Sequence, residues 1–183
     1  MFRRPGMRFA AAQALGPMEM AQLQNANRLM ASGQPEKAAP IFLQLARELQ
    51  ATQHPRKAAN LHALASHAFT DAKEETQALQ QAQVTLRFFV RLQMLPRAAQ
   101  FFGNIRNKMN HNGMSASATE LEKEFGGVLA KVPARTLGGM QQGLRHLPTN
   151  CPKCRAPLRA DEVEWVDAMT ASCSFCGSVV AKE

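Results

Sequence analysis

The residues with the most evident chemistry are four cysteines near the end of the chain. They form the sequences CPKC at 151–154 and CSFC at 173–176, so the spacing is C-x2-C-x18-C-x2-C. Zinc in structural sites takes four ligands at tetrahedral angles, with Zn–S distances of about 2.3 Å. Two tight turns that each supply two thiolates meet this need, and the long spacer between them lets them converge. The spacing predicts one structural Zn²⁺ bound by Cys151, Cys154, Cys173 and Cys176.

Other uses of the four cysteines remain as alternatives. Two disulfides would also use an even number of cysteines, but the paired spacing and the lack of a good export signal favour reduced thiols. A thioredoxin-like redox site needs one C-x2-C in a βαβ setting, which is missing here. A rubredoxin-type iron site uses the same ligands, but such domains are usually richer in acidic and aromatic residues. Residues 148–183, here called the cysteine module, have only Trp165 and Phe175 as aromatics.

The cysteine module is expected to contain short strands. Glu162 to Trp165 alternate between polar and apolar, and Ser178 to Val180 form a last strand after Gly177, whereas Asp167 to Thr170 suggest a turn. These features and the two cysteine turns resemble a zinc ribbon over residues 148–183. The family often has Gly after the second ligand, where this chain has Arg155, so we expect backbone strain at the first turn without loss of a ligand.

The resemblance to a zinc ribbon also indicates what the metal does. A segment of about 36 residues buries too little apolar surface to fold stably without a disulfide or a metal ion. The metal's first role is therefore structural. All four ligand positions are filled by cysteines, which leaves none open for a catalytic water.

Upstream of the module, residues 17–130 carry the pattern of a helical repeat. Pro35, Pro55 and Pro96 stand where the first turn of a helix tolerates proline, and helices are expected to start about every 20 residues. Apolar residues recur at steps of three and four, as on one face of a helix. The expected helices are 17–31, 35–51, 55–70, 73–93, 96–110 and 115–130, which pair into three helical hairpins whose stacking would make a continuous core.

One hairpin resembles the middle of a tetratricopeptide repeat. Gly33, Glu36, Ala38 and Phe42 match the turn glycine, acidic residue, small residue and aromatic of that family. Later units depart further, and the period is nearer 40 than the family's 34, so other helical-hairpin folds remain open. The expected fold class is therefore mainly α, with tetratricopeptide-like stacked hairpins followed by a small β zinc ribbon.

The remaining segments complete the expected organisation of this 183-residue chain. Residues 1–16 are a basic leader, expected to be disordered and weak as an export signal, because Gln13 interrupts its short apolar part. Residues 131–147 are a Gly/Pro-rich basic linker between the helical domain at 17–130 and the zinc ribbon at 148–183. No run of apolar residues is long enough to cross a bilayer, so no membrane span is predicted and a cytoplasmic protein is expected.

The net charge favours an acidic partner without identifying it. The formal charge is +8, and it falls to about +6 if four thiolates and one Zn²⁺ together contribute −2. Two stretches hold basic residues and no acids. One contains Lys131, Arg135, Arg145, Lys153, Arg155 and Arg159, and the other contains Arg87, Arg91, Arg97, Arg106 and Lys108. Phe88, Phe89, Phe101 and Phe102 lie in the second stretch and could stack on nucleic-acid bases, but their helical spacing favours a place in the core.

These features favour a non-enzymatic adaptor, in which helical repeats present a groove to a protein or peptide and the zinc ribbon adds a second docking surface. The alternative is a nucleic-acid-binding protein that uses the ribbon and its basic neighbourhood, with weak binding expected. A third hypothesis is a redox protein with iron at the cysteines. The acidic run at Glu120, Glu122 and Glu124 is interpreted as a solvated charge run rather than an acid–base site. His62 and His67 are too poorly placed on one helix face to clamp a metal.

Overall fold

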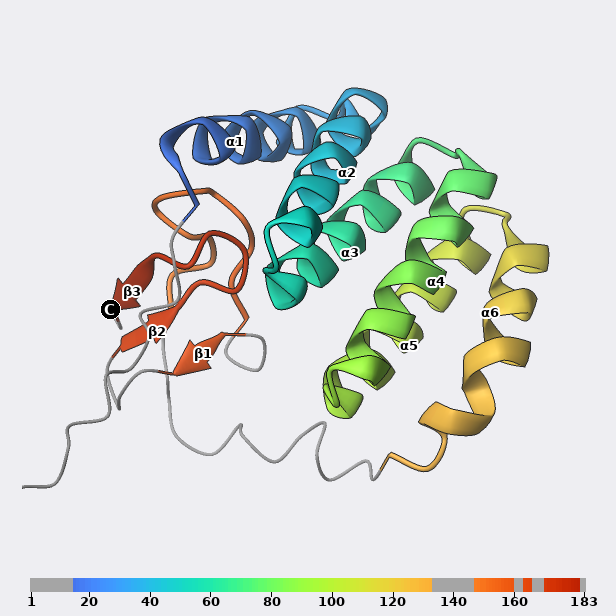
Figure 1. The fold of residues 1–183 in the computed structure, drawn as a ribbon. Coiled ribbons are helices and arrows are strands. Elements are labelled where there is room, and N and C mark those ends of the chain that lie inside the picture. The colour runs from blue at the N-terminus through green and yellow to red at the C-terminus, as the bar shows by residue number, and fades with distance from the viewer. Residues whose placement is uncertain (1–14, 133–146, 160–162, 166–169, 182–183) are drawn as a thin grey trace, which may run out of the picture.

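The computed structural model describes residues 15–132, 147–159, 163–165 and 170–181. Within these ranges six helices are followed by a small sheet (Figure 1). The elements are α1 Pro17–Ala31, α2 Pro35–Ala51, α3 Pro55–Asp71, α4 Glu75–Arg91, α5 Leu95–His111, α6 Ser115–Leu129, β1 Glu164–Trp165, β2 Thr170–Ser172 and β3 Val179–Ala181. The six predicted helices are confirmed, and the largest difference is at α4, which begins later and ends earlier than expected.

One kind of turn joins all six helices. After α1, the Gly33 N–H donates to the Met30 carbonyl at 3.1 Å and the Gln34 N–H donates to the Leu29 carbonyl at 2.9 Å. This pair of bonds is the Schellman motif, which needs a residue with positive φ just past the helix. The same bonds recur at the next four turns. The residues with positive φ at the five turns are Gly33, Gln53, Lys73, Gln93 and Gly113, so the turn recurs at a constant interval along the chain.

The core follows the same interval. One series consists of fully or nearly fully buried alanines in the first turn of successive helices: Ala38, Ala58, Ala78, Ala98 and Ala118. A second series consists of large buried residues in the last turn: Leu49, Phe69, Phe89, Met109 and Leu129. A methyl group lets neighbouring backbones approach closely where helices begin, and a large side chain fills the space where they end. The repeating unit is therefore one helix with its turn, and two such units make a hairpin.

The helices pack in two rows. Each helix contacts the next one along the chain, while α3 also contacts α5 and α4 also contacts α6. Arg87 on α4 pairs with Glu124 on α6 at 2.8 Å, and Lys108 on α5 pairs with Asp71 at the end of α3 at 2.6 Å. Odd-numbered and even-numbered helices thus form different faces of the array.

The three strands form an antiparallel sheet in the order β1-β2-β3. Thr170 was expected in a turn, but it begins β2 and pairs with Ala181 of β3, so that expectation is wrong at this residue. Its neighbours 166–169 and the start of the expected first strand at Glu162 lie outside the described residues. Strand β2 has little apolar alternation of its own, since it reads Thr-Ala-Ser, and pairing with both neighbours holds it in the sheet.

The turn geometry gives a prediction in which one kind of substitution has opposite effects at two sites. Gln93→Gly should raise the free energy of unfolding by up to about 1 kcal/mol, because a non-glycine residue at positive φ costs roughly that much. The same change at the exposed helix position Gln80 should lower it by about 1 kcal/mol. Gly113→Ala should also destabilise by about 1 kcal/mol through the backbone alone, since nothing lies within 4 Å of an added Cβ. Urea unfolding followed by circular dichroism measures all three; destabilisation by Gln93→Gly would contradict the turn assignment.

Candidate metal centre

Two turns with the same hydrogen bonds hold the four cysteines. In the first, the Arg155 N–H donates to the Cys151 carbonyl and the Cys151 N–H donates to the Ala156 carbonyl, both at 2.8 Å. The second turn repeats these bonds, from Gly177 to Cys173 and from Cys173 to Ser178, again at 2.8 Å. Arg155 has φ 63° and Gly177 has φ 77°. The predicted strain at Arg155 is therefore confirmed, and the turn still presents both of its cysteines.

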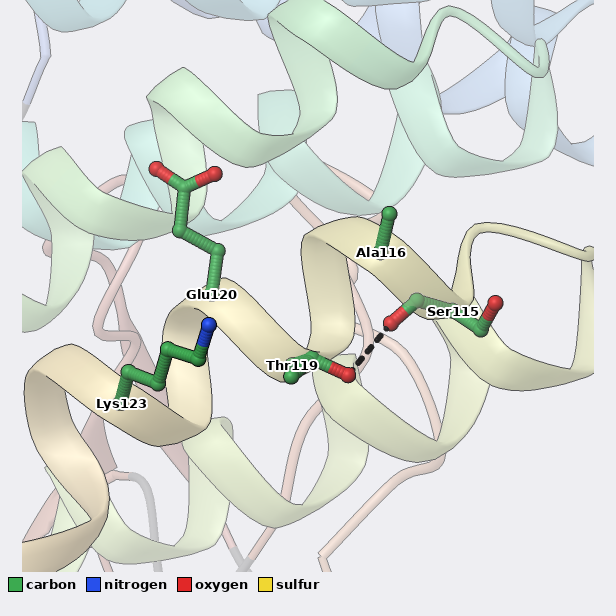
Figure 2. Close-up of a pocket in the computed structure, with 5 residues that line it drawn as sticks. All are labelled: Ser115, Ala116, Thr119, Glu120 and Lys123. Atoms are coloured by element: carbon green, nitrogen blue, oxygen red, sulfur yellow. Dashed lines mark hydrogen bonds between the residues drawn. The ribbon is translucent and has the colours of Figure 1, made fainter.

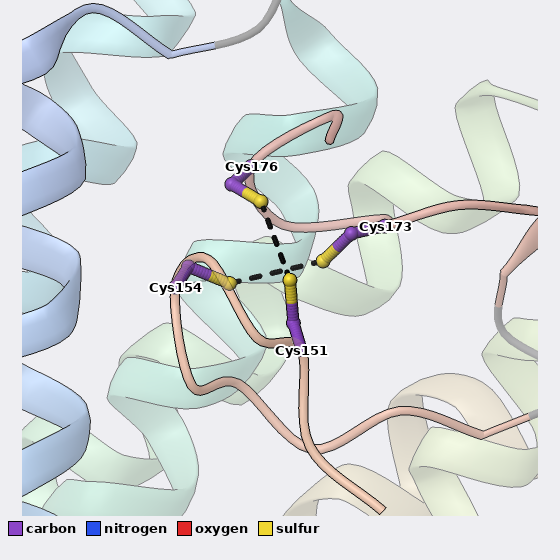
Figure 3. Close-up of side chains that lie close together, drawn as sticks. All are labelled: Cys151, Cys154, Cys173 and Cys176. Atoms are coloured by element: carbon purple, nitrogen blue, oxygen red, sulfur yellow. Dashed lines mark hydrogen bonds between the residues drawn. The ribbon is translucent and has the colours of Figure 1, made fainter. Parts of the chain in front are cut away.

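The four sulfur atoms converge on one point (Figure 3). All four lie within 4.8 Å of one another, and the Cys151–Cys176 and Cys154–Cys173 sulfur pairs are each 3.8 Å apart. A tetrahedron with metal–sulfur distances of about 2.3 Å has sulfur–sulfur edges of about 3.8 Å, whereas a disulfide would bring two sulfurs to about 2.05 Å. The cysteines are free and at most 1% exposed. The cluster can hold one metal ion and is compatible with zinc.

The pKa shifts of the clustered cysteines favour a bound cation. Hydrogen bonding to Cys151 raises the pKa of Cys154 and of Cys173, because the buried thiols cannot all ionise side by side. A divalent ion would make four thiolates stable there. Lys57 on α3 brings a positive charge to the same place: burial lowers its pKa, and the nearby Cys176 and Cys173 act in the opposite direction. The Ser178 hydroxyl lies 2.7 Å from the Cys176 sulfur and can donate to a thiolate.

Side-chain amides from two helices bind the backbone of both cysteine turns. Asn27 on α1 donates from Nδ2 to the Cys154 carbonyl at 2.9 Å, and Gln24 on the same helix donates to the Lys153 carbonyl. Asn60 on α3 donates from Nδ2 to the Ser174 carbonyl at 2.7 Å. These bonds connect both cysteine turns directly to α1 and α3.

The module also shares its apolar core with the helices. Phe175, Leu158 and Val180 belong to the same contiguous buried cluster as the helix cores. The main-chain N–H of Leu15, just before α1, donates to the Cys176 carbonyl at 3.1 Å. The sequence leaves the docking of module and helices open, and the structure shows that they are in contact. The linker predicted at 131–147 lies mostly outside the described residues.

No spacing or motif in the sequence identifies the side-chain amides that bind the cysteine turns. The one feature that could have indicated Asn60 is that it is a polar residue among apolar ones, since it follows Ala58 and Ala59 and precedes Leu61 in α3. Asn60 is only 3% exposed, and a buried helical asparagine needs a reason beyond helix propensity.

The glutamates and histidines that the sequence analysis does not assign to a functional site make contacts away from the cysteine cluster. Glu122 and Glu124 pair with Arg106 and Arg87, while Glu120 accepts a bond from Gln83 at 3.3 Å. His62 and His67 do not join the cysteine cluster: the His62 Nδ1 lies 2.8 Å from the Gln81 Oε1, and the His67 ring packs edge-on against Phe101. Among the described residues, the four cysteines form the one group with metal-ligand geometry.

The phenylalanines of the basic helical stretch lie in the core as expected. Phe89, Phe101 and Phe102 are buried, and Phe88 is half-buried. Lys153, Arg155 and Arg159 around the first cysteine turn are exposed, whereas Arg135 and Arg145 lie outside the described residues. The exposed basic surface therefore lacks phenylalanines for base stacking in the part of the chain that is described.

A shallow hollow lies on α6 (Figure 2). Its lining consists of Ser115, Ala116, Thr119, Glu120 and Lys123. The Thr119 hydroxyl is occupied by a bond to the Ser115 carbonyl at 2.9 Å. The hollow is open to solvent, and one of its two hydroxyls, that of Thr119, is engaged by its own helix.

Comparisons of the chain with protein-family models, with curated proteins and with solved structures give no match. Across the described residues, no helix has both the length and the apolar character needed to cross a membrane.

The docking contacts predict the effect of removing one amide. Asn27→Ala leaves the Cys154 carbonyl without its partner, so the free energy of unfolding should fall by about 1–3 kcal/mol. Asn25→Ala is the matched control, because Asn25 lies exposed on the same helix. Urea unfolding of both variants measures the difference. Equal stabilities for the two variants would show that the amide does not hold the module.

Proposed function

We propose that this chain is a non-enzymatic interaction protein whose four cysteines hold one structural Zn²⁺. The observation that carries the proposal is the buried cluster of four cysteine sulfurs within 4.8 Å of one another, whose two turns are bonded to α1 and α3 through side-chain amides. Four cysteines complete a tetrahedral shell, whereas catalytic zinc keeps one position for water or substrate. The ion would then stabilise the cysteine module in its position against the helices.

Zinc is favoured over iron by the surroundings of the ligands. Both metals accept four thiolates in a tetrahedron, but the module has few aromatic residues. Its second cysteine turn joins β2 and β3 of a small antiparallel sheet, and its first turn is closed by the Asn150–Pro157 bridge. We infer that the module is a zinc ribbon. Its first role is to hold together a segment too small for a core of its own.

We further infer that the helices form an interaction array of the tetratricopeptide kind, with a longer period. Stacked helical repeats make extended surfaces for protein partners. The module contacts α1 through Asn27 and α3 through Asn60, so it occupies part of the odd-numbered face. A protein partner would then bind the face of α2, α4 and α6, including the open hollow on α6, and would contact the exposed residues of the first cysteine turn as a second surface.

The metal assignment gives a direct prediction. Protein purified under reducing conditions should contain about one zinc per chain, and Co²⁺ substitution should give the absorption spectrum of a tetrahedral tetrathiolate site. Cys173→Ser should abolish stoichiometric binding and unfold the module, because metal binding and folding are coupled there. Ser174→Ala is the matched control, since its side chain is outside the ligand set and its carbonyl remains to accept from Asn60. Iron in place of zinc, or two disulfides, would overturn the proposal.

A nucleic-acid-binding role is the second candidate, because Lys153, Arg155 and Arg159 are exposed on and beside the first cysteine turn. Three positive charges can contact phosphates. One observation weighs against tight binding, because Phe175 of the module is buried and so is not available for base stacking. The proposed zinc tetrathiolate would also add a charge of −2 nearby.

The two candidate functions differ in salt dependence and in partner. We expect non-specific nucleic-acid affinity of about 10⁻⁴ to 10⁻⁶ M at physiological salt. Replacing Lys153, Arg155 and Arg159 together with Gln should flatten the salt slope by up to about three phosphate contacts' worth. A protein partner should remain bound after nuclease treatment and be lost from the Cys173→Ser variant. A tight complex with a selected nucleic acid, or capture that nuclease abolishes, would replace the adaptor proposal with the second candidate.

A further inference from the structure

One face of α3 lies against the second cysteine turn. Asn60 donates from its Nδ2 to the Ser174 carbonyl at 2.7 Å, so the helix bonds to the backbone between the two cysteines of that turn. Leu64, four residues further along the helix, lines a cavity between the module and the helices together with Phe175 of the same turn. Residues three or four apart share one face of a helix. The module therefore covers the face of α3 that carries Asn60 and Leu64.

Lys57 lies on this face, in the first turn of α3. It precedes Asn60 by three residues, and it is half-buried, whereas the adjacent Arg56 is exposed. Burial lowers the pKa of Lys57, while the charges of Cys176 and Cys173 act to raise it. The lysine is therefore near enough to both cysteines of the second turn for their charges to act on it.

A metal-bound cluster of four thiolates would carry negative charge away from water. Four thiolates and one divalent ion sum to about −2, and all four cysteines are buried. Buried charge is costly unless it is hydrogen-bonded or lies near an opposite charge. Gln24 and Asn27 on α1 are neutral amides, so they bind the first turn without offsetting this charge. An ammonium group on α3 would reduce the total to about −1.

We propose that Lys57 is a charged partner of the metal ligands, set beside the second cysteine turn by α3, so that the helical array contributes to metal affinity. This inference rests on the proposed Zn²⁺ site and names the helical residue that supports it. Lys57 attracts the thiolates, and Asn60 holds the backbone between two of them. Coupling between two binding equilibria is reciprocal. If the metal holds the module on the helices, docking on α3 strengthens metal binding by the same factor.

Competition with a chromogenic chelator measures the zinc affinity of the full-length chain. Lys57→Met removes the charge and keeps a long side chain, and it should weaken zinc binding about tenfold, as expected for a residue that supports metal ligands. Arg56→Met is the matched control, because it removes the same charge from the exposed neighbouring position and should leave the affinity unchanged. Lys57→Arg keeps the charge and should retain most of the affinity. Lys57→Gln is a second uncharged variant, and circular dichroism checks that each variant is folded.

The spectrum of the Co²⁺-loaded chain separates an effect of charge from an effect of packing. A positive charge near the thiolates stabilises their electrons, so its removal should move the sulfur-to-cobalt charge-transfer band of Lys57→Met to longer wavelength. The band should stay in place in Arg56→Met and Lys57→Arg. A residue that only supports the fold would change the affinity without moving the band, and that result would overturn the role of Lys57.

The inference and the proposed metal site fail in different ways. A full-length chain that binds no zinc would overturn the site and this inference with it. Stoichiometric zinc with equal affinity in the unaltered chain and in Lys57→Met would leave the site standing and overturn the role of Lys57. An equal loss of affinity in Lys57→Met and Arg56→Met would also overturn it, because the effect would then belong to the overall charge of the chain.

Discussion

Four buried sulfur atoms set 3.8 Å apart in pairs are the constraint on which the rest of the molecule depends. Thiols at this density cannot all ionise without a cation. A metal bound there, as proposed above, would hold together two turns that are well separated in the sequence. Their backbone carbonyls, fixed in this way, become acceptors for Asn27 and Asn60 on two different helices. The geometry of a bound metal would in this way influence how the module packs against α1 and α3.

The array in turn provides a regular surface for the module. Helices α2 to α5 each begin with a buried alanine and end in a Schellman turn, and these features recur at a constant interval. Side chains on α1, α3 and α5 contact the module or line the cavity between the module and the helices. Asn60 is buried and donates to the Ser174 carbonyl of the module, which explains a polar residue that helix propensity alone does not favour.

The sequence predicts the helices well because proline starts, apolar spacing and breakers all act within one turn of the chain. It predicts the cysteine cluster for the same reason, since ligand type and spacing define a tetrahedral site. The sequence predicts a turn rather than a strand at Thr170, because β2 has no apolar alternation of its own and forms through pairing with β1 and β3. Asn27, Asn60 and the cavity beside Phe175 depend on contacts between residues that are far apart in the sequence. No local sequence pattern predicts such contacts.

The central claim is that the metal holds the cysteine module onto the helices. Amide hydrogen exchange of the full-length chain, measured with the metal bound and after its removal by a chelator, tests this most directly. The account predicts that removal speeds exchange in α1 and α3, which bond to the cysteine turns, while α6 keeps its protection. If α1 and α3 exchange at the same rate in both states, the module and the helices are independent and the account is wrong.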